Sequence, residues 1–380
     1  MERTLFEPEH EMFRETVRSF LEKEAVPHHA EWEAAGQVDR AVWTAAGETG
    51  LLGMGVDEEY GGGGTPDFRY NLVLGEEMAR LAVHGPGFTL QNDIIEPYLT
   101  GLATREQKQR WLPGFCSGET ITAIAMTEPG AGSDLQGIRT TAVRDGDSYV
   151  LNGSKTFITN GIHADLVIVV AKTDPDAGAH GTSLLVVERG TPGFERGRNL
   201  DKVGLSAQDT AELHFADVRV PAENLLGTEG GGFVALMENL PQERLSIATT
   251  AAAGAEAAFA ETLRYAKDRT AFGKPIGSFQ ANRFTLAEMA TQLEVMRAFV
   301  DRAVVAHLDG RLTIAEAAMT KWWTTELLVE VVDRCVQLHG GYGYMNEYAI
   351  ARAWKDSRIS TIYGGTTEIM KEIVGRSLGV

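Results

Sequence analysis

The spacing of apolar residues changes twice along this chain of 380 residues, and this change constrains the fold more than any other feature. In the first third, apolar side chains recur at the spacing of an amphipathic helix over four ranges, 8–26, 41–47, 70–81 and 105–115. The four glycines at 61–64 are typical of a loop between such helices. We therefore expect an all-helical domain over residues 1–120.

Short segments with the composition of strands come next. The ranges 140–144 and 148–152 flank Asp145-Gly146, a dipeptide typical of a hairpin turn. Three more strands are predicted at 166–171, 183–188 and 211–220, where short runs of mainly β-branched and apolar residues occur. These segments predict a middle β-domain over residues 121–227.

Long helical patterns return in the last third. The ranges 246–269, 279–308 and 313–338 each exceed the usual length of a helix in a globular protein, which is typical of a bundle with short loops. Thr313 and Glu316 form a capping box at one start, and Gly340-Gly341 suits a helix end. We expect a C-terminal helical domain over residues 228–380, so the chain falls in the α+β class.

Composition excludes several kinds of protein. A formal net charge of −18 argues against a nucleic-acid-binding protein, which presents a basic face. The only two cysteines, Cys116 and Cys335, exclude a disulfide framework, and no grouping of ligands predicts a metal site. No apolar run reaches the length of a membrane span, and no signal or transit peptide is visible. We therefore expect a cytoplasmic protein.

A turn rich in glycine and hydroxyl groups lies at the start of the middle domain, in the string MTEPGAGSDLQG at 126–137. Glycine lets the main chain approach a polar ligand, to which Thr127 and Ser133 could also donate. Composition alone favours a simple surface turn. The fingerprint of a Rossmann dinucleotide site fails, because Leu135 stands where a third glycine is needed.

A second string, QLHGGYGYM at 337–345, changes the interpretation of the first. Together with LNGSK, LPQERL and IYGGTTEIMKE, the two strings resemble the signatures of the acyl-CoA dehydrogenase family, in register from about residue 13 to about residue 372. Within that family the chain is similar to the long-chain branch. The resemblance implies an N-terminal helical domain, a β-barrel-like middle domain and a C-terminal four-helix bundle.

The resemblance also implies an activity. Enzymes of this family use FAD to convert an acyl-CoA, here of long or branched chain, to a trans-2-enoyl-CoA in fatty-acid β-oxidation. They pass electrons to an electron-transferring flavoprotein and are mostly homotetramers. Two other interpretations stay open: an acyl-CoA oxidase or a dehydrogenase of secondary metabolism, and a non-catalytic oligomer that binds flavin and acyl-CoA.

The catalytic base departs from the usual family position. That position holds Gly364, whereas the long-chain and isovaleryl branches place the base in an ERL string, which here makes Glu243 the base. Pro241 predicts an irregular first helical turn around Glu243. We expect a bound acyl chain and flavin to raise the pKa of Glu243 from about 4.3 toward roughly 6–7. The alternative is a solvated helical glutamate beside Arg244.

The remaining site residues come from the resemblance. Gly364 keeps a backbone N–H for the thioester oxygen, and its missing side chain is expected to leave space for a base from another helix. Substrate contacts are implied for Ser133, His180, Arg244, Gly364 and Gly365. Cofactor contacts are implied for Met126, Thr127, Ser133, Phe157, Ile158, Thr159, Arg269, Phe272, Gln280, Gln337, Gly340, Gly341, Thr366, Thr367 and Glu368, several of them on a neighbouring subunit. Phe157 replaces the tryptophan common in relatives.

Overall fold

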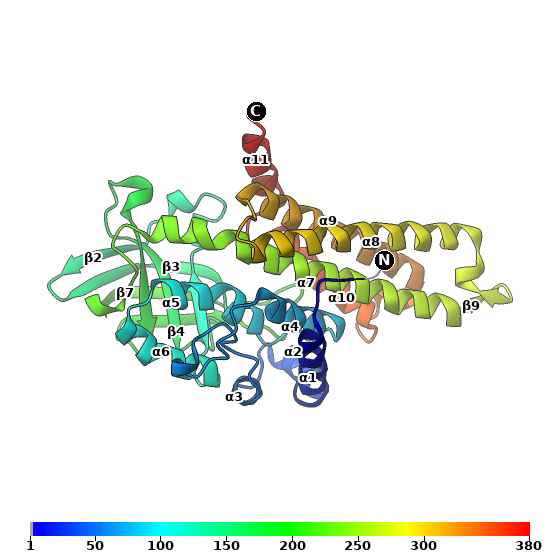
Figure 1. Ribbon diagram of the computed structural model, residues 1–380, viewed down its shortest axis with the longest axis horizontal. Helices are drawn as coiled ribbons and strands as arrows, with labels where there is room; N and C mark the ends of the chain where they lie inside the picture. Colours follow the sequence, from blue (N-terminus) through cyan, green and yellow to red (C-terminus); the bar gives the residue numbers. More distant parts are fainter. Residues whose placement is uncertain (1–2) are drawn as a thin grey trace.

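The computed structural model describes residues 3–380 and begins with a helical part (Figure 1). Its helices are α1 (Pro8–Glu24), α2 (His29–Ala35), α3 (Ala41–Glu48), α4 (Phe68–Arg80), α5 (Glu96–Leu102) and α6 (Arg105–Ser117). The four helices expected from apolar spacing are α1, α3, α4 and α6. The others, and a π-helical turn at Leu90–Ile95 that runs into α5, are too short to show a clear period.

One sheet forms the middle part, at the left of Figure 1. Its strands are β1 (Thr122–Ala125), β2 (Thr141–Asp145), β3 (Ser148–Thr159), β4 (Leu166–Lys172), β5 (Thr182–Glu188), β6 (Phe194–Asn199), β7 (Thr210–Pro221) and β8 (Leu225–Leu226). The predicted hairpin is confirmed, since β2 and β3 pair antiparallel with Asp145 opposite Ser148. The strand order is β6-β7-β3-β2-β4-β5-β8, with β1 parallel to β4.

The sheet curves around one apolar core. Tyr149 and Leu213 from β3 and β7 share this core with Val169 and Leu185 from β4 and β5. The arrangement is therefore barrel-like, although the pairing order leaves β6 and β8 at two open ends. The other face of β4 and β5 packs against α5 and α6, which places the helical part directly beside the sheet.

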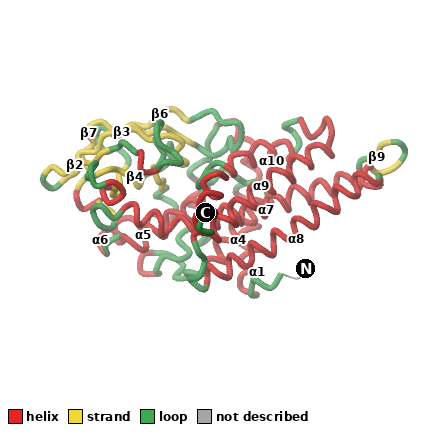
Figure 2. Tube along the Cα trace, turned by 90° about the horizontal axis from the view of Figure 1, so that it is seen from above, coloured by secondary structure: helices red, strands yellow, loops and turns green. Residues whose placement is uncertain are grey.

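Long helices form the last part and run away from the sheet, as Figure 2 shows. They are α7 (Gly232–Asp268), α8 (Gln280–Leu308) and α9 (Ile314–His339), followed by the shorter α10 (Ala349–Ser357) and α11 (Thr367–Ser377). A small hairpin of β9 (Thr270–Ala271) and β10 (Lys274–Pro275) joins α7 to α8. The Thr313–Glu316 capping box is present at the start of α9, and Gly340 ends that helix. Both shorter helices pack on α9, and α10 also packs on α7.

Helix α7 corrects one expectation. It begins at Gly232 rather than near Ser246, so Glu243 lies inside a helix of 37 residues and not in an irregular first turn. Pro241 removes one backbone hydrogen bond, but Leu236, Leu240 and Leu245 are buried on either side of it. Burial of these side chains keeps the helix continuous through the proline.

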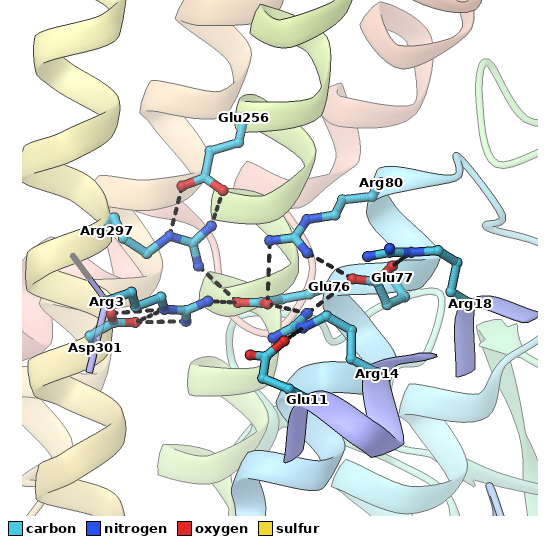
Figure 3. A network of polar contacts seen from close by, with 10 residues as sticks. All are labelled: Arg3, Glu11, Arg14, Arg18, Glu76, Glu77, Arg80, Glu256, Arg297 and Asp301. Carbon is cyan, nitrogen blue, oxygen red and sulfur yellow. Dashed lines mark hydrogen bonds and ion pairs between the residues drawn. The ribbon is translucent and has the colours of Figure 1, made fainter. Parts of the chain in front are cut away.

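A network of charged side chains ties the helical parts together (Figure 3). At its centre the fully buried carboxylate of Glu76, on α4, accepts hydrogen bonds from Arg3 (2.6 Å), Arg14 (2.9 Å) and Arg297 (2.8 Å). Arg3 also pairs with Asp301 on α8 at 2.7 Å. The network therefore links the first residues of the described chain to α1, α4 and α8.

No helix within residues 3–380 is both long enough and apolar enough to cross a membrane.

Candidate active site

A cavity of about 360 Å³ lies where α7 meets the sheet, the π-helical turn and the segment before α11. It is lined by residues from each of the predicted site strings: Met126, Thr127, Ser133, Phe157, Ile158, Thr159, Glu243, Arg244, Gly364 and Gly365. Residues up to 239 positions apart in the sequence, Met126 and Gly365, are thus brought to one cavity by the fold.

Glu243 is the buried carboxylate of this cavity. Its side chain is 5% exposed, and one of its oxygens, Oε1, accepts a hydrogen bond from the Tyr98 hydroxyl at 2.9 Å. Burial raises the pKa of Glu243 to about 7, although the Tyr98 hydrogen bond and the charge of Arg244 both act to lower it. Burial within the protein therefore raises the pKa of Glu243 without a bound acyl chain or flavin, which had been expected to be needed for this shift.

Arg244 brings an unsatisfied donor to the same place. The side chain is 5% exposed, and its Nε has no hydrogen-bond partner within residues 3–380. Burial lowers the pKa of this guanidinium, and the neighbouring Glu243 opposes that shift. A buried donor without an acceptor is costly, so the cavity is suited to a ligand that carries acceptor atoms.

The turn at Met126–Ser133 is fixed by a buried ion pair, Lys155 with Glu128, that no sequence motif indicated. Lys155, fully buried on β3, donates to the carbonyl of Met126 and to Oε1 of Glu128, both at 2.9 Å. Glu128 also accepts from the backbone N–H groups of Arg139 and Thr140. The pair fixes the main chain whose side chains line the cavity.

Phe157 offers an uncovered aromatic ring to the cavity. It is 69% exposed, and its backbone has a φ of +59°, in the left-handed region that phenylalanine rarely adopts. The neighbouring Ile158 is buried, so the irregular backbone turns one apolar ring outward while the strand stays packed. An exposed ring in a cavity that also holds the unsatisfied Nε donor of Arg244 fits a planar, polar-edged cofactor such as a flavin.

The Gly364-Gly365 turn forms another wall. Both glycines have positive φ, +62° and +98°. A Cβ at position 364 would lie 2.3 Å from Cδ1 of Ile247. This corrects the expectation of free space at Gly364, because the Ile247 side chain already occupies it.

A buried lysine holds that turn from behind. Lys321, on α9, is fully buried and donates from Nζ to the carbonyl oxygen of Gly365 at 2.7 Å. Burial lowers its pKa to about 8. Directly beyond the turn, Thr366 caps α11, and the Thr367 hydroxyl donates to Glu326 of α9 at 2.5 Å. The turn is therefore anchored to α9 at two points.

A polar cluster lies under the base helix. Asp93, in the π-helical turn, accepts hydrogen bonds from Ser246 of α7 and from Asn71 of α4, the latter at 2.8 Å. Gln242 donates to the Asp93 backbone carbonyl at 2.7 Å. These bonds hold α7 against the π-helical turn on both sides of Glu243.

Other predicted site residues lie elsewhere. Arg269, Gln337, Gly340 and Gly341 line a second, open groove at the end of α7 and α9, with Tyr265 and Tyr342. Phe272 is 95% exposed on the loop between β9 and β10. Gln280 and His180 are also exposed, at the start of α8 and in a short 3₁₀ turn. Glu368 is exposed in the first turn of α11.

Within residues 3–380, no group of three or more His, Cys, Asp or Glu residues could hold a metal ion.

Comparisons with known proteins match the whole chain. The N-terminal, middle and C-terminal domains of acyl-CoA dehydrogenase match residues 7–119, 123–218 and 230–379. The long-chain specific acyl-CoA dehydrogenase of Sus scrofa is 52% identical over 99% of this chain and 88% of that protein. The short-chain specific enzyme of Bos taurus is 38% identical over 97% of this chain and 90% of that protein. The crystal structure of acyl-CoA dehydrogenase from Geobacillus kaustophilus is 55% identical, with a TM-score of 0.98 and full coverage of both chains.

The fold and these matches define an FAD-dependent flavoprotein oxidoreductase. The chain belongs to the acyl-CoA dehydrogenase family. Relatives named for long and for short acyl chains both cover it nearly end to end, so membership of the family leaves the substrate length open.

Proposed function

We propose that this acyl-CoA dehydrogenase converts a long-chain or branched acyl-CoA to the trans-2-enoyl-CoA, with Glu243 as the catalytic base. One observation carries the assignment of the base. Glu243 is a buried carboxylate, with a pKa raised to about 7, in a cavity that also presents Phe157 and the Gly364 turn. A base with that pKa exists in both protonation states near neutral pH, as general base catalysis requires.

The residues of the chain divide the work. Glu243 takes the α-proton of the acyl thioester, and the N–H of Gly364 donates to the thioester oxygen as negative charge develops there. Lys321 holds the Gly364-Gly365 turn in the conformation that this hydrogen bond needs. FAD, when bound, supplies the acceptor for the β-hydride, which no amino-acid side chain can provide. Met126, Thr127, Ser133, Phe157, Ile158 and Thr159 would hold its ring system.

A continuation of the cavity supports a long acyl chain. A neighbouring cavity of about 140 Å³ adjoins the cavity that holds Glu243. The two share five lining residues: His84, Leu205, Ile247, Thr250 and Tyr363. The neighbouring cavity follows one face of α7 away from Glu243, and most of its lining is apolar or small: Ala251, Gly254, Ala257, Ala258, Leu328, Val332 and Ile350. An extended apolar lining beyond the base suits a chain longer than butyryl.

The remaining roles rest on the family resemblance. The groove with Arg269, Gln337, Gly340 and Gly341 would receive the adenylate end of FAD bound mainly to a neighbouring subunit of a homotetramer, together with Phe272 and Gln280. Arg269 suits this role, because its planar fork pairs with two phosphate oxygens. Thr366, Thr367 and Glu368 would lie near the pyrophosphate, and His180 near the CoA. We place the reaction in fatty-acid β-oxidation in the cytoplasm, with an electron-transferring flavoprotein as acceptor.

The test is anaerobic mixing of the FAD-loaded protein with acyl-CoAs of increasing length while the flavin absorbance is followed. Rapid bleaching is expected with long-chain substrates, and Glu243→Gln should keep its flavin but lose at least about 10²-fold in rate. Glu238→Gln is the control, because Glu238 is exposed on the same helix. Bleaching that survives in Glu243→Gln would contradict the base. Bound flavin that no acyl-CoA reduces would favour the non-catalytic alternative, and oxygen consumption that matches substrate oxidation would favour the oxidase.

A further inference from the structure

A tyrosine from a different part of the chain contacts the proposed base. Tyr98 lies on α5, 145 positions before Glu243, and its side chain is fully buried. Its hydroxyl bonds to Oε1 of Glu243 at 2.9 Å. Tyr98 lies outside all of the sequence motifs described above.

The direction of this hydrogen bond is fixed. Burial and the charge of Glu243 raise the pKa of Tyr98 far above its ordinary value, so the phenol keeps its proton in neutral and mildly alkaline solution. Tyr98 is therefore a permanent donor, and Oε1 of Glu243 is the acceptor. Oε2 accepts no hydrogen bond within residues 3–380 and stays free to receive a proton.

We propose that Tyr98 is a positioning residue for Glu243: it holds Oε1, presents Oε2 to the substrate and favours the ionised form of the carboxylate. The inference rests on the proposed function of Glu243 as base. During the reaction the α-proton moves to Oε2 and the C–H electron pair stays with the substrate. Tyr98 keeps its own proton throughout, so it touches no reacting atom.

In the part of the chain that the structure describes, the other charged and titratable groups around Glu243 do not form hydrogen bonds with its carboxylate. Arg244 is the charged neighbour on α7, and it acts on Glu243 through space without a hydrogen bond. Lys321, on α9, is bonded to Gly365, and Asp93, in the π-helical turn, is bonded to Ser246 and Asn71. His84 and Tyr363 are the other titratable groups of the cavity lining, and neither forms a hydrogen bond or ion pair with the Glu243 carboxylate. Within residues 3–380, only Tyr98 donates directly to the base.

Replacing Tyr98 by phenylalanine removes one hydroxyl and retains the ring that packs in the core. A hydrogen bond to an ionised group favours the ionised form, so its loss raises the pKa of Glu243 further. We expect the acid limb of the pH profile for flavin bleaching to move up by about one to two pH units. The rate should fall about 5- to 50-fold near pH 7 and recover in alkaline buffer, where the base is again ionised.

Tyr149→Phe is the matched control. Tyr149 is also fully buried and also donates to a glutamate, Glu229, at 2.8 Å, but it lies on β3 away from this cavity lining. It should lose stability to a similar degree and leave the pH profile in place. An equal shift in both variants, or no shift in Tyr98→Phe while the parent protein bleaches normally, would overturn the inference.

A second measurement separates this inference from the proposed function. Infrared difference spectra of isotope-labelled glutamate, with Glu243→Gln as the blank, follow the carboxyl band of Glu243 through a pH titration without substrate. The band should titrate at higher pH in Tyr98→Phe than in the parent. Coincident titrations would refute the role of Tyr98 even if the enzyme is active, whereas a shift in a protein that no acyl-CoA bleaches would support it while the proposed function fails.

Discussion

The side chain of Ile247 fills the place where a side chain at position 364 would begin. A Cβ at Gly364 would lie 2.3 Å from Cδ1 of Ile247, which is one helical turn after Glu243 on α7. Helix α7 therefore brings in the Glu243 carboxylate and, with the next turn, fills the space beside Gly364. The two features form one steric unit.

This unit predicts coupling between the two positions. Gly364→Ala should destabilise the protein by about 1–3 kcal/mol, because alanine is disfavoured at a φ of +62° and its Cβ meets Ile247. In Ile247→Ala the second substitution should cost less, since only the backbone strain remains. Denaturation midpoints of the two single variants and the double variant give the coupling. Strict additivity would contradict the steric argument.

Lys321→Met should slow the reaction more than it weakens the fold. The variant leaves the Gly365 carbonyl without its donor and frees the turn that presents Gly364. We expect the rate of flavin bleaching to fall about 10-fold, equivalent to about 1.4 kcal/mol, with bound FAD retained. Lys267→Met, at an exposed position near the end of α7, serves as control. If the rate is unchanged, Lys321 has only a packing role.

The Lys155–Glu128 pair should respond unequally to removal of its members. Glu128→Gln leaves a fully buried ammonium with one carbonyl partner, which costs about 3–5 kcal/mol. Lys155→Met leaves Glu128 with two backbone donors and should cost about 1–3 kcal/mol. Chemical denaturation, with FAD content per chain as a second readout, measures both. Equal costs would mean that the backbone donors contribute little.

Glu76 should make the protein sensitive to acid. Burial alone would raise the pKa of Glu76, but Arg3, Arg297, Arg14 and Arg80 together hold it below its ordinary value. The stabilisation is therefore complete above the unfolded pKa of about 4.3 and is lost as the pH falls through the lower folded pKa.

Glu76→Gln should lower the denaturation midpoint at neutral pH, because Arg3, Arg14 and Arg297 lose their central, fully buried partner, at a cost of about 3–5 kcal/mol. It should also flatten the loss of stability in acid. Glu11→Gln is the control, since Glu11 is a more exposed partner of Arg14 and should cost less than about 1 kcal/mol. Parallel acid curves for the parent and Glu76→Gln would show that other carboxylates control the transition.

The sequence predicts elements whose signal is local. Apolar spacing located α8 and α9 to within a residue or two, and the Thr313 capping box marked the start of α9 correctly. The first turns of α7 were missed, because Pro241 looks like a helix boundary when the buried leucines around it cannot be seen. The π-helical turn has no periodic signal at all.

The site divides in the same way. Motifs identified Glu243, Phe157 and the Gly364 turn, and the fold brings these to one cavity. Tyr98 and Lys321 depend on contacts across 145 and 44 positions, and neither has a local pattern that marks it. Lys155 was missed because the predicted strand ended at residue 152, whereas β3 runs on to Thr159 and buries this lysine, whose charge then requires a partner.

The ion pair between Arg3 and Asp301 has a consequence for folding during synthesis on the ribosome. The two residues are 298 positions apart, so at about 5–20 residues per second the ribosome needs about 15–60 s to deliver the second after the first. Arg297, which also reaches Glu76, emerges in the same late interval. Until then, the nascent N-terminal helices hold the Glu76 carboxylate without Arg297 and without the Arg3–Asp301 pair. The network is therefore completed after translation or very late in it.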